Sequence, residues 1–489
     1  MEAPENPFND EETATFLKVS EPRPPQGLAK LGLNPSLCIE ICKMAMPVVL
    51  GMLTQTAINI LDTVMVGHLP KELANPGQAA IGLSLPIMWL VGGCLSSLWV
   101  GTQAITSRRV GEGQEHNAGA TLTNSLLLAI IGSILATGIA LLIAEPILFA
   151  LYADEVVAQT AVDYINLRFL GIGAMVCTFS YKSFFDGTGR TYMFMVAALI
   201  MNILNVFLNY IFIFGSPLLG LEQMGAPGAA IASVISAYIG LIILVVWSLK
   251  KSLRQKYQYY ASGRLNKNVL MEILRLSVPN GVATIVVMTG FEAFYWVVGR
   301  VNDAHALPGN PVIATANQVL VTVVMLTFMT ALAFGSATAA MVGQSLGAKR
   351  PQLAEEYAWN AVKIGAYLAW IYGIILYCFP ENILALVNSD PQIIAIATPT
   401  LQGMAAFQGF IAMAVIFAQM LYGIGHAKFV MYVEFCLHLL VMSPIAYLFG
   451  IVFDLGLSGI YAGPGLYVMI LLIATSIKFF SGDWKELEI

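Results

Sequence analysis

An acidic residue, Asp62, follows two polar residues along a predicted apolar helix. Gln55 and Asn59 precede Asp62 by seven and three residues, which places all three side chains on one helix face. A carboxylate inside a membrane costs on the order of 3 kcal/mol or more, so such residues usually serve a function. Oxygen groups of this kind suit a proton or a hard cation such as Na+. Asp62, Gln55 and Asn59 are therefore coupling-ion candidates, and a hydrogen bond to a neighbouring helix is the structural alternative.

The same apolar run contains Pro47, which lies N-terminal to Asp62. Proline removes one backbone hydrogen bond of a helix and commonly bends it. Pro47 is therefore the predicted hinge of the first span.

Three asparagines share one face of another apolar run. Asn202, Asn205 and Asn209 follow the i, i+3, i+7 spacing of a helix. Buried amides of this kind either serve a functional site or hold helices together by hydrogen bonds. The spacing alone leaves both interpretations open.

A carboxylate lies among aromatic residues in the segment that contains Phe291, Glu292 and Tyr295. Negative charge next to aromatic rings suits an organic cation, which binds both by charge and by cation–π attraction. These three residues are the substrate-binding candidates. The alternative is core packing, with Glu292 near the outer lipid headgroups.

Glu434 and His438 are four residues apart on a further apolar run and could exchange a proton. Because Glu434 lies about two turns from the inner end of that run, we expect it to extend toward the cytosol instead.

The composition decides which class of protein must hold these residues. Of 489 residues, 58% are apolar and 11% are charged, less than half of the roughly 25% typical of soluble proteins. This composition predicts a polytopic membrane protein. It excludes a soluble enzyme, a nucleic-acid-binding protein and a secreted disulfide scaffold. The six cysteines are interpreted as ordinary thiols, and neither a cofactor nor a resident metal is expected.

Twelve apolar runs approach the roughly 20 residues that a helix needs to cross a bilayer. The predicted fold is therefore an all-α membrane protein of twelve transmembrane helices. The predicted spans are 44–67, 79–106, 120–144, 160–182, 192–214, 226–249, 272–300, 313–345, 357–378, 395–422, 428–452 and 457–479.

Lys and Arg residues set the predicted orientation. With the N-terminus inside, twenty of them lie inside and two lie outside, as the positive-inside rule requires. We expect both termini in the cytosol and the chain in the plasma membrane, which in a bacterium is the inner membrane.

The two halves of the sequence repeat each other. Matches at an offset of 236 residues are Glu145 with Glu381, Asp154 with Asp390, and Gly187 with Gly423. Earlier in each half the offset is 232, so 66–67 match 298–299. Two halves of six spans run in the same direction, and a pseudo-two-fold axis along the membrane normal relates them. The predicted parts are a disordered cytosolic tail (1–37), an N-lobe (38–249), a cytosolic loop (250–271), a C-lobe (272–479) and a cytosolic C-terminus (480–489).

Such a repeat is typical of secondary transporters, which place their site between the lobes. The sequence has no GxxxxGK[ST] motif, so no ATPase domain is expected. An ion gradient would then drive transport.

Several segments together resemble the multidrug and toxic compound extrusion (MATE) family of secondary transporters. The segments are 61–69 after Pro47, 187–191, 202–215, 225–233 and 342–348. The resemblance implies two six-helix lobes, alternating access, and export of cations or drugs driven by H+ or Na+. It also implies an N-lobe ion site at Asp62, Asn205, Asn209 and Ser233. Asn209 stands where many members have a second Asp, and this difference favours H+, with Na+ at Asp62 the alternative.

The predicted function is therefore export of organic cations or drugs in exchange for H+ or Na+. The expected partners are a small-molecule cation and membrane lipids, and we expect a monomer. A lipid-linked precursor flippase of the same superfamily is the alternative. Such a flippase should line its cavity with several basic residues, whereas only Arg168 and Lys363 lie within predicted spans and away from their ends.

Overall fold

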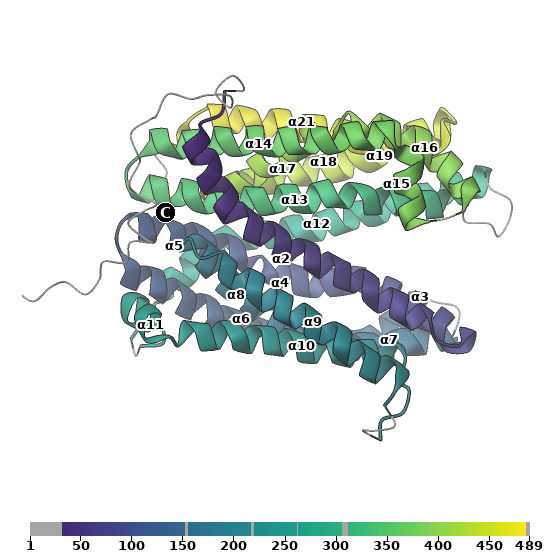
Figure 1. Ribbon diagram of the computed structural model, residues 1–489, viewed down its shortest axis with the longest axis horizontal. Helices are drawn as coiled ribbons and strands as arrows, with labels where there is room; N and C mark the ends of the chain where they lie inside the picture. The colour runs from purple at the N-terminus through teal and green to yellow at the C-terminus, as the bar shows by residue number, and fades with distance from the viewer. Residues whose placement is uncertain are drawn as a thin grey trace, which may run out of the picture.

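The computed structural model describes residues 32–151, 155–216, 220–261, 263–305, 312–388 and 390–485. Most of the predicted N-terminal tail therefore lies outside the described residues. The remainder is almost entirely helical, and two bundles of helices lie side by side (Figure 1).

The N-lobe comprises ten consecutive elements. They are α2 (Pro35–Gly67), α3 (Lys71–Met88), the π-helical turn η2 (Trp89–Gly93), α4 (Cys94–Ser96), α5 (Leu98–Gly111), α6 (Glu115–Leu151), α7 (Glu155–Phe169), α8 (Ile172–Gly187), α9 (Tyr192–Phe214) and α10 (Ala226–Ser248). A short helix, α11 (Lys251–Tyr257), follows on the way to the second lobe.

The C-lobe repeats this arrangement. Its elements are α12 (Lys267–His305), α13 (Val312–Gly347), α14 (Pro351–Cys378), α15 (Pro380–Val387), α16 (Pro391–Ala405), α17 (Gln408–Gly423), α18 (Ala427–Leu437), η4 (His438–Met442), α19 (Ser443–Tyr447), η5 (Leu448–Val452), α20 (Gly456–Ile460), α21 (Ala462–Phe480) and η6 (Asp483–Lys485).

Membrane-spanning helices account for nearly all of the described chain. Nine stretches are long and apolar enough to cross a bilayer, and two bent helix pairs bring the number to eleven. These pairs, α7 with α8 and α16 with α17, bend by 44° and 59° and coincide with the predicted spans 160–182 and 395–422. The remaining predicted span, 79–106, falls on the consecutive elements α3, η2, α4 and α5. The two-lobed, twelve-helix fold is thus confirmed.

Helix α2 contacts both lobes. The side chain of Asn34 caps its start by accepting from Ser36 N, and Pro35 occupies the first turn. In Figure 1 it runs diagonally from the C-lobe toward α3 and α9 of the N-lobe. The buried side chains of its first half, Ile41 and Met44 among them, belong to one core cluster with α13, α14 and α17. The helix continues without a break through Pro47.

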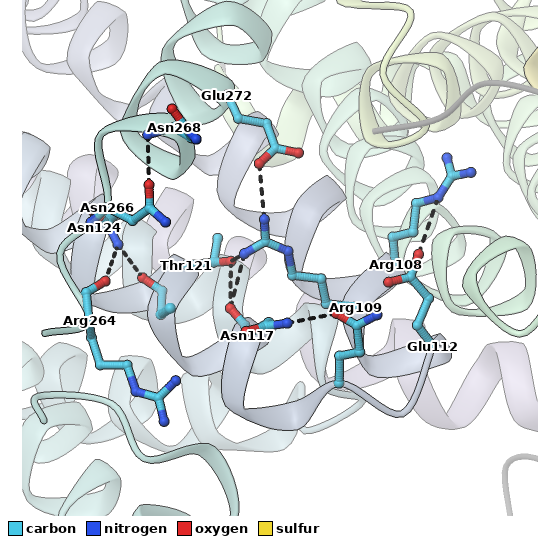
Figure 2. A network of polar contacts seen from close by, with 12 residues as sticks. Arg108, Arg109, Glu112, Asn117, Thr121, Asn124, Arg264, Asn266, Asn268 and Glu272 are labelled. Atoms are coloured by element: carbon cyan, nitrogen blue, oxygen red, sulfur yellow. Dashed lines mark hydrogen bonds and ion pairs between the residues drawn. The ribbon is translucent and has the colours of Figure 1, made fainter.

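Residues 249–266 connect the two lobes at one end of the molecule, which we call the linker end. Polar contacts join the lobes near this end. Gln103 of α5 donates to Ser336 O of α13 at 2.6 Å, and Gln344 of α13 donates to Gly187 O of α8 at 2.7 Å. Figure 2 shows a third connection, in which the Arg109 guanidinium of α5 contacts Glu272 of α12 at 3.0 Å. The lobes are therefore closed against each other at the linker end.

Candidate functional site

Asp62 lies in the last turns of α2 and is almost completely buried, with 3% of its surface exposed. Asn209 of α9 donates to its Oδ1 at 2.5 Å. Ser233 of α10 donates to its Oδ2 at 3.1 Å. Three helices that are distant in sequence thus meet at one carboxylate, and each carboxylate oxygen accepts a hydrogen bond from a neutral group.

Asn205 completes this cluster one turn before Asn209 on α9. Its amide can be placed in two orientations. In the orientation that satisfies both of its ends, the amide nitrogen donates to Asp62 Oδ1 at 3.2 Å and the oxygen accepts from Ser233 N at 3.3 Å. We call Asp62, Asn205, Asn209 and Ser233 the N-lobe cluster.

The electrostatics of this cluster are those of a single negative charge among amides and a hydroxyl. Among the described residues, no Lys or Arg forms an ion pair with Asp62, although the charge of Arg168 on α7 lies close enough to act on it. The buried hydroxyl of Tyr164, also on α7, lies within the field of both charges. A proton on Asp62 would remove this buried negative charge, whereas a small cation would balance it.

The cluster also offers neutral oxygen atoms. Asn209 Oδ1 is buried and has no partner in the described part of the chain. The same holds for both polar atoms of Asn202, which lies two turns before Asn209 on the same face of α9. Carbonyl-type oxygens are ligands for hard cations. No group of three His, Cys, Asp or Glu side chains suited to a metal occurs in the described ranges.

The other two residues predicted on the Asp62 face are Gln55 and Asn59. Gln55 is exposed. The side chain of Asn59 lies outside what the structure describes. The predicted hinge, Pro47, lies where α2 passes from its C-lobe contacts to its N-lobe contacts.

The predicted substrate residues share one exposed face of α12. Phe291 and Tyr295 are 38% and 37% exposed, and Glu292 is exposed beside them. The charge of Glu292 lies close enough to act on the Tyr295 hydroxyl. Phe294, which corresponds to Asp62 at the offset of 232, is instead buried against Tyr461. An acid and two aromatic rings are therefore accessible together, as contact with an organic cation would require.

Three charged groups have surroundings that the sequence did not indicate. Glu434 does not extend to the surface, because Tyr467 of α21 donates to its Oε2 at 2.7 Å inside the C-lobe. On α8, Lys182 and Asp186 form an ion pair of 2.6 Å, with side chains 5% and 0% exposed. Their i, i+4 spacing is the signal from which this pair could have been found.

The chain matches the MatE family over residues 47–211 and 279–448, so each match begins at a proline of one half. It is 25% identical to the probable multidrug resistance protein NorM of Thermotoga maritima, across 92% of this chain and 94% of that protein. It is also 25% identical to the multidrug resistance protein MdtK of Pectobacterium atrosepticum, across 90% and 95%.

The fold resembles solved structures across almost its full length. One is the outward-facing conformation of a multidrug resistance MATE family transporter of the MOP superfamily, with a TM-score of 0.82, 20% identity, and coverage of 92% of this chain and 97% of that chain. Another is the crystal structure of MATE in complex with MaL6, with a TM-score of 0.80, 21% identity, and coverage of 91% and 95%.

Proposed function

Because the chain belongs to the MatE family, we propose that it is a secondary antiporter that exports organic cations or drugs in exchange for H+. The chain is a multi-pass membrane protein of the multidrug efflux type, as its relatives' names indicate. The coupling ion, the cargo class and the direction of transport are the proposal. The observation that carries it is the buried carboxylate of Asp62, which neutral donors from α9 and α10 surround.

In this mechanism Asp62 alternates between an ionised and a protonated state. The ionised carboxylate accepts hydrogen bonds from Asn209 and Ser233. A protonated carboxyl group must itself donate, so these contacts have to rearrange when the proton arrives. A proton therefore changes how the end of α2 fits against α9 and α10.

Helix α2 is suited to carry this change to the lobe interface. Its first half packs in the core of the C-lobe, and its second half carries Asp62 in the N-lobe. A change of fit at Asp62 acts on the C-lobe through the same helix, with Pro47 between the two parts. By linkage, the proton and the cargo then oppose each other's binding by the same factor.

We further propose that the linker end faces the cytosol, in the plasma membrane, because most Lys and Arg residues lie toward that end. With the linker end closed by the Gln103–Ser336 and Arg109–Glu272 contacts, this structure would correspond to an outward-facing state. Glu292, Phe291 and Tyr295 would contact the cargo from α12. No partner subunit or cofactor enters the proposal.

The test is transport of rhodamine 6G by the purified chain in proteoliposomes, under either a pH gradient or a Na+ gradient. We expect proton-driven transport in the wild type, at least about a tenfold loss in Asp62→Asn, and no loss in Asp163→Asn. Asp163 is the matched control because it is an exposed acid on α7. Na+-driven transport would replace H+ by Na+ in the proposal, and absence of cation transport under both gradients would favour a lipid-linked flippase.

A further inference from the structure

The C-lobe holds a second ionisable cluster, mostly shielded from solvent, at the junction of α18 and the π-helical turn η4. His438 Nδ1 lies 3.2 Å from Glu434 Oε2 and 3.0 Å from Glu434 O. The Tyr467 hydroxyl of α21 donates to the same Oε2 at 2.7 Å. The side chains of His438 and Glu434 are 2% and 12% exposed. We call Glu434, His438 and Tyr467 the C-lobe cluster.

Aromatic rings and a glycine enclose the imidazole of His438. The ring of Tyr467 lies 4.7 Å from it and that of Phe291 lies 5.8 Å from it, centroid to centroid. On α12, a Cβ at Gly290 would lie 2.7 Å from His438 Cβ, so α12 approaches the imidazole closely because it has no side chain there. Any change at His438 therefore acts directly on α12.

Few charges face this cluster from the elements packed around it. From α17, the hydroxyl of Tyr422 lies within the field of Glu434. From α12, Asn280 contacts Tyr422 as a neutral amide, and Glu292 lies beside Phe291 on an exposed face. From α21, all of whose residues the structure describes, Tyr467 is the ionisable residue that contacts the cluster. Among the described residues no Lys or Arg pairs with Glu434, so His438 is the group that can balance its charge.

The C-lobe cluster lies between the helices that correspond, in the repeat, to the helices of the N-lobe cluster. The N-lobe cluster joins α2, α9 and α10, and the C-lobe cluster joins their repeat counterparts α12, α18–η4 and α21. At the offset of 236, His438 corresponds to Asn202, which lies about one turn from Asn205. The two halves of the chain therefore bury an ionisable group between equivalent helices, although the residues themselves are not equivalent.

We infer that Glu434 and His438 form a second proton-binding site, so that each lobe carries one proton site of its own. Without the added proton, the pair consists of a carboxylate and a neutral imidazole and carries one negative charge. When the proton binds, the imidazole becomes an imidazolium and the pair becomes neutral overall. Tyr467 is a positioning residue, because its hydroxyl fixes the carboxylate oxygen that faces the imidazole.

This site would act on the lobe interface through α12, as Asp62 acts through α2. Helix α12 contacts His438 at Gly290 and Phe291. Nearer its start it contacts the N-lobe, where Glu272 pairs with Arg109 and the Ser277 hydroxyl accepts from Gly101 N. The coupling role rests on the proposed proton-driven antiport, whereas proton binding itself does not.

The first experiment measures proton binding directly, without cargo. The purified chain is titrated between about pH 8 and pH 5, the range in which histidines change charge, and infrared difference spectra record carboxylate and imidazole bands. We expect Glu434→Gln and His438→Asn to lose the same bands and to take up one proton fewer per chain. Glu381→Gln, an exposed acid in the same lobe, should match the wild type. Unchanged spectra in either folded cluster variant would overturn the inference.

The second experiment measures protons released when tetraphenylphosphonium is added in weakly buffered solution. We expect Glu434→Gln to release one proton fewer than the wild type, while Tyr467→Phe releases the full number at a shifted pH. Equal release in Glu434→Gln and wild type would overturn the coupling role. If the wild type releases none, the proposed antiport fails, and the infrared titration still decides whether the site binds a proton.

Discussion

Gly111 of α5 and Gly347 of α13 lie in equivalent places of the two lobes, and each contacts a main-chain carbonyl of the other lobe. A Cβ at Gly111 would overlap the carbonyl oxygen of Gln344, and a Cβ at Gly347 would overlap that of Arg108. Both glycines and both carbonyl residues are related by the same offset of 236. The lobes therefore meet at the linker end in a symmetric contact that requires glycine on both sides.

Replacing either glycine by alanine should weaken this contact. Gly111→Ala or Gly347→Ala must separate α5 from α13, and overpacking of this kind costs about 1–3 kcal/mol. That energy would shift the equilibrium between closed and open linker ends by a factor of about 5 to 150. Hydrogen–deuterium exchange should then rise at the ends of α5 and α13 in both variants.

Gly138→Ala is the matched control, because a Cβ there meets no other atom. Exchange should remain at the wild-type level in this variant. If Gly111→Ala and Gly347→Ala exchange no faster than Gly138→Ala, the glycine contact does not hold the linker end closed.

The centre of the N-lobe cluster could be predicted from the sequence because polar residues are rare within apolar runs. Asp62, Asn205 and Asn209 stand out in this way and are buried, whereas their grouping into one site came from the resemblance to the MATE family. Gln55 shares the helix face of Asp62 but lies exposed. The physical reason is that α2 changes its packing partners along its length, from the C-lobe to the N-lobe. The positions of side chains around one helix do not show which neighbouring helices it packs against along its length.

The spacing of Glu434 and His438 indicated that the two could exchange a proton, but their surroundings could not be predicted for a related reason. The position of Glu434 along its own helix suggested that it would reach the surface, but α21 covers it and supplies Tyr467. Which helices cover a side chain depends on tertiary packing. The fold itself was predictable, since span length, charge distribution and repeat all indicated the same twelve-helix, two-lobe arrangement.

The ion pair between Lys182 and Asp186 should contribute to stability mainly through the penalty for breaking it. Asp186→Asn leaves the ammonium group of Lys182 buried and without its partner, which costs about 3–5 kcal/mol. The double variant Lys182→Met with Asp186→Leu removes both charges and should recover most of this loss. Thermal unfolding in detergent measures the order of stability.

Asp303→Asn provides the comparison, since this acid is exposed at the end of α12. Its unfolding temperature should equal that of the wild type. A double variant as unstable as Asp186→Asn would show that the pair contributes through its packing and not through paired charge.

His426, in the turn between α17 and α18, should make stability depend on pH. Burial, together with the charge of Lys478, lowers the pKa of His426 below its ordinary value of 6.5, while Asp483 acts in the opposite direction. As the pH falls through about 6.5, the unfolded chain binds a proton before the folded chain does, so folding stability decreases. His426→Gln should therefore lose less stability than the wild type between about pH 7.5 and 5.5. An equal loss in both proteins would contradict this assignment.

The hydroxyl of Ser233 should favour the ionised form of Asp62 over the protonated form. It donates to Asp62 Oδ2 at 3.1 Å, and a hydrogen bond to a charged group contributes about 1.5–3 kcal/mol. Ser233→Ala should therefore bind the proton about 10 to 150 times more tightly and, by linkage, bind an opposing cation correspondingly more weakly. Ser236→Ala is the matched control on the same helix, because the Ser236 hydroxyl donates to Ala232 O within α10.

Binding of tetraphenylphosphonium at several pH values separates the outcomes. In Ser233→Ala the affinity should fall at neutral pH and recover as the pH rises, because a higher pH restores the ionised carboxylate. Equal loss at every pH would instead indicate a general distortion of the site, and equal affinity in both serine variants would remove Ser233 from the coupling mechanism.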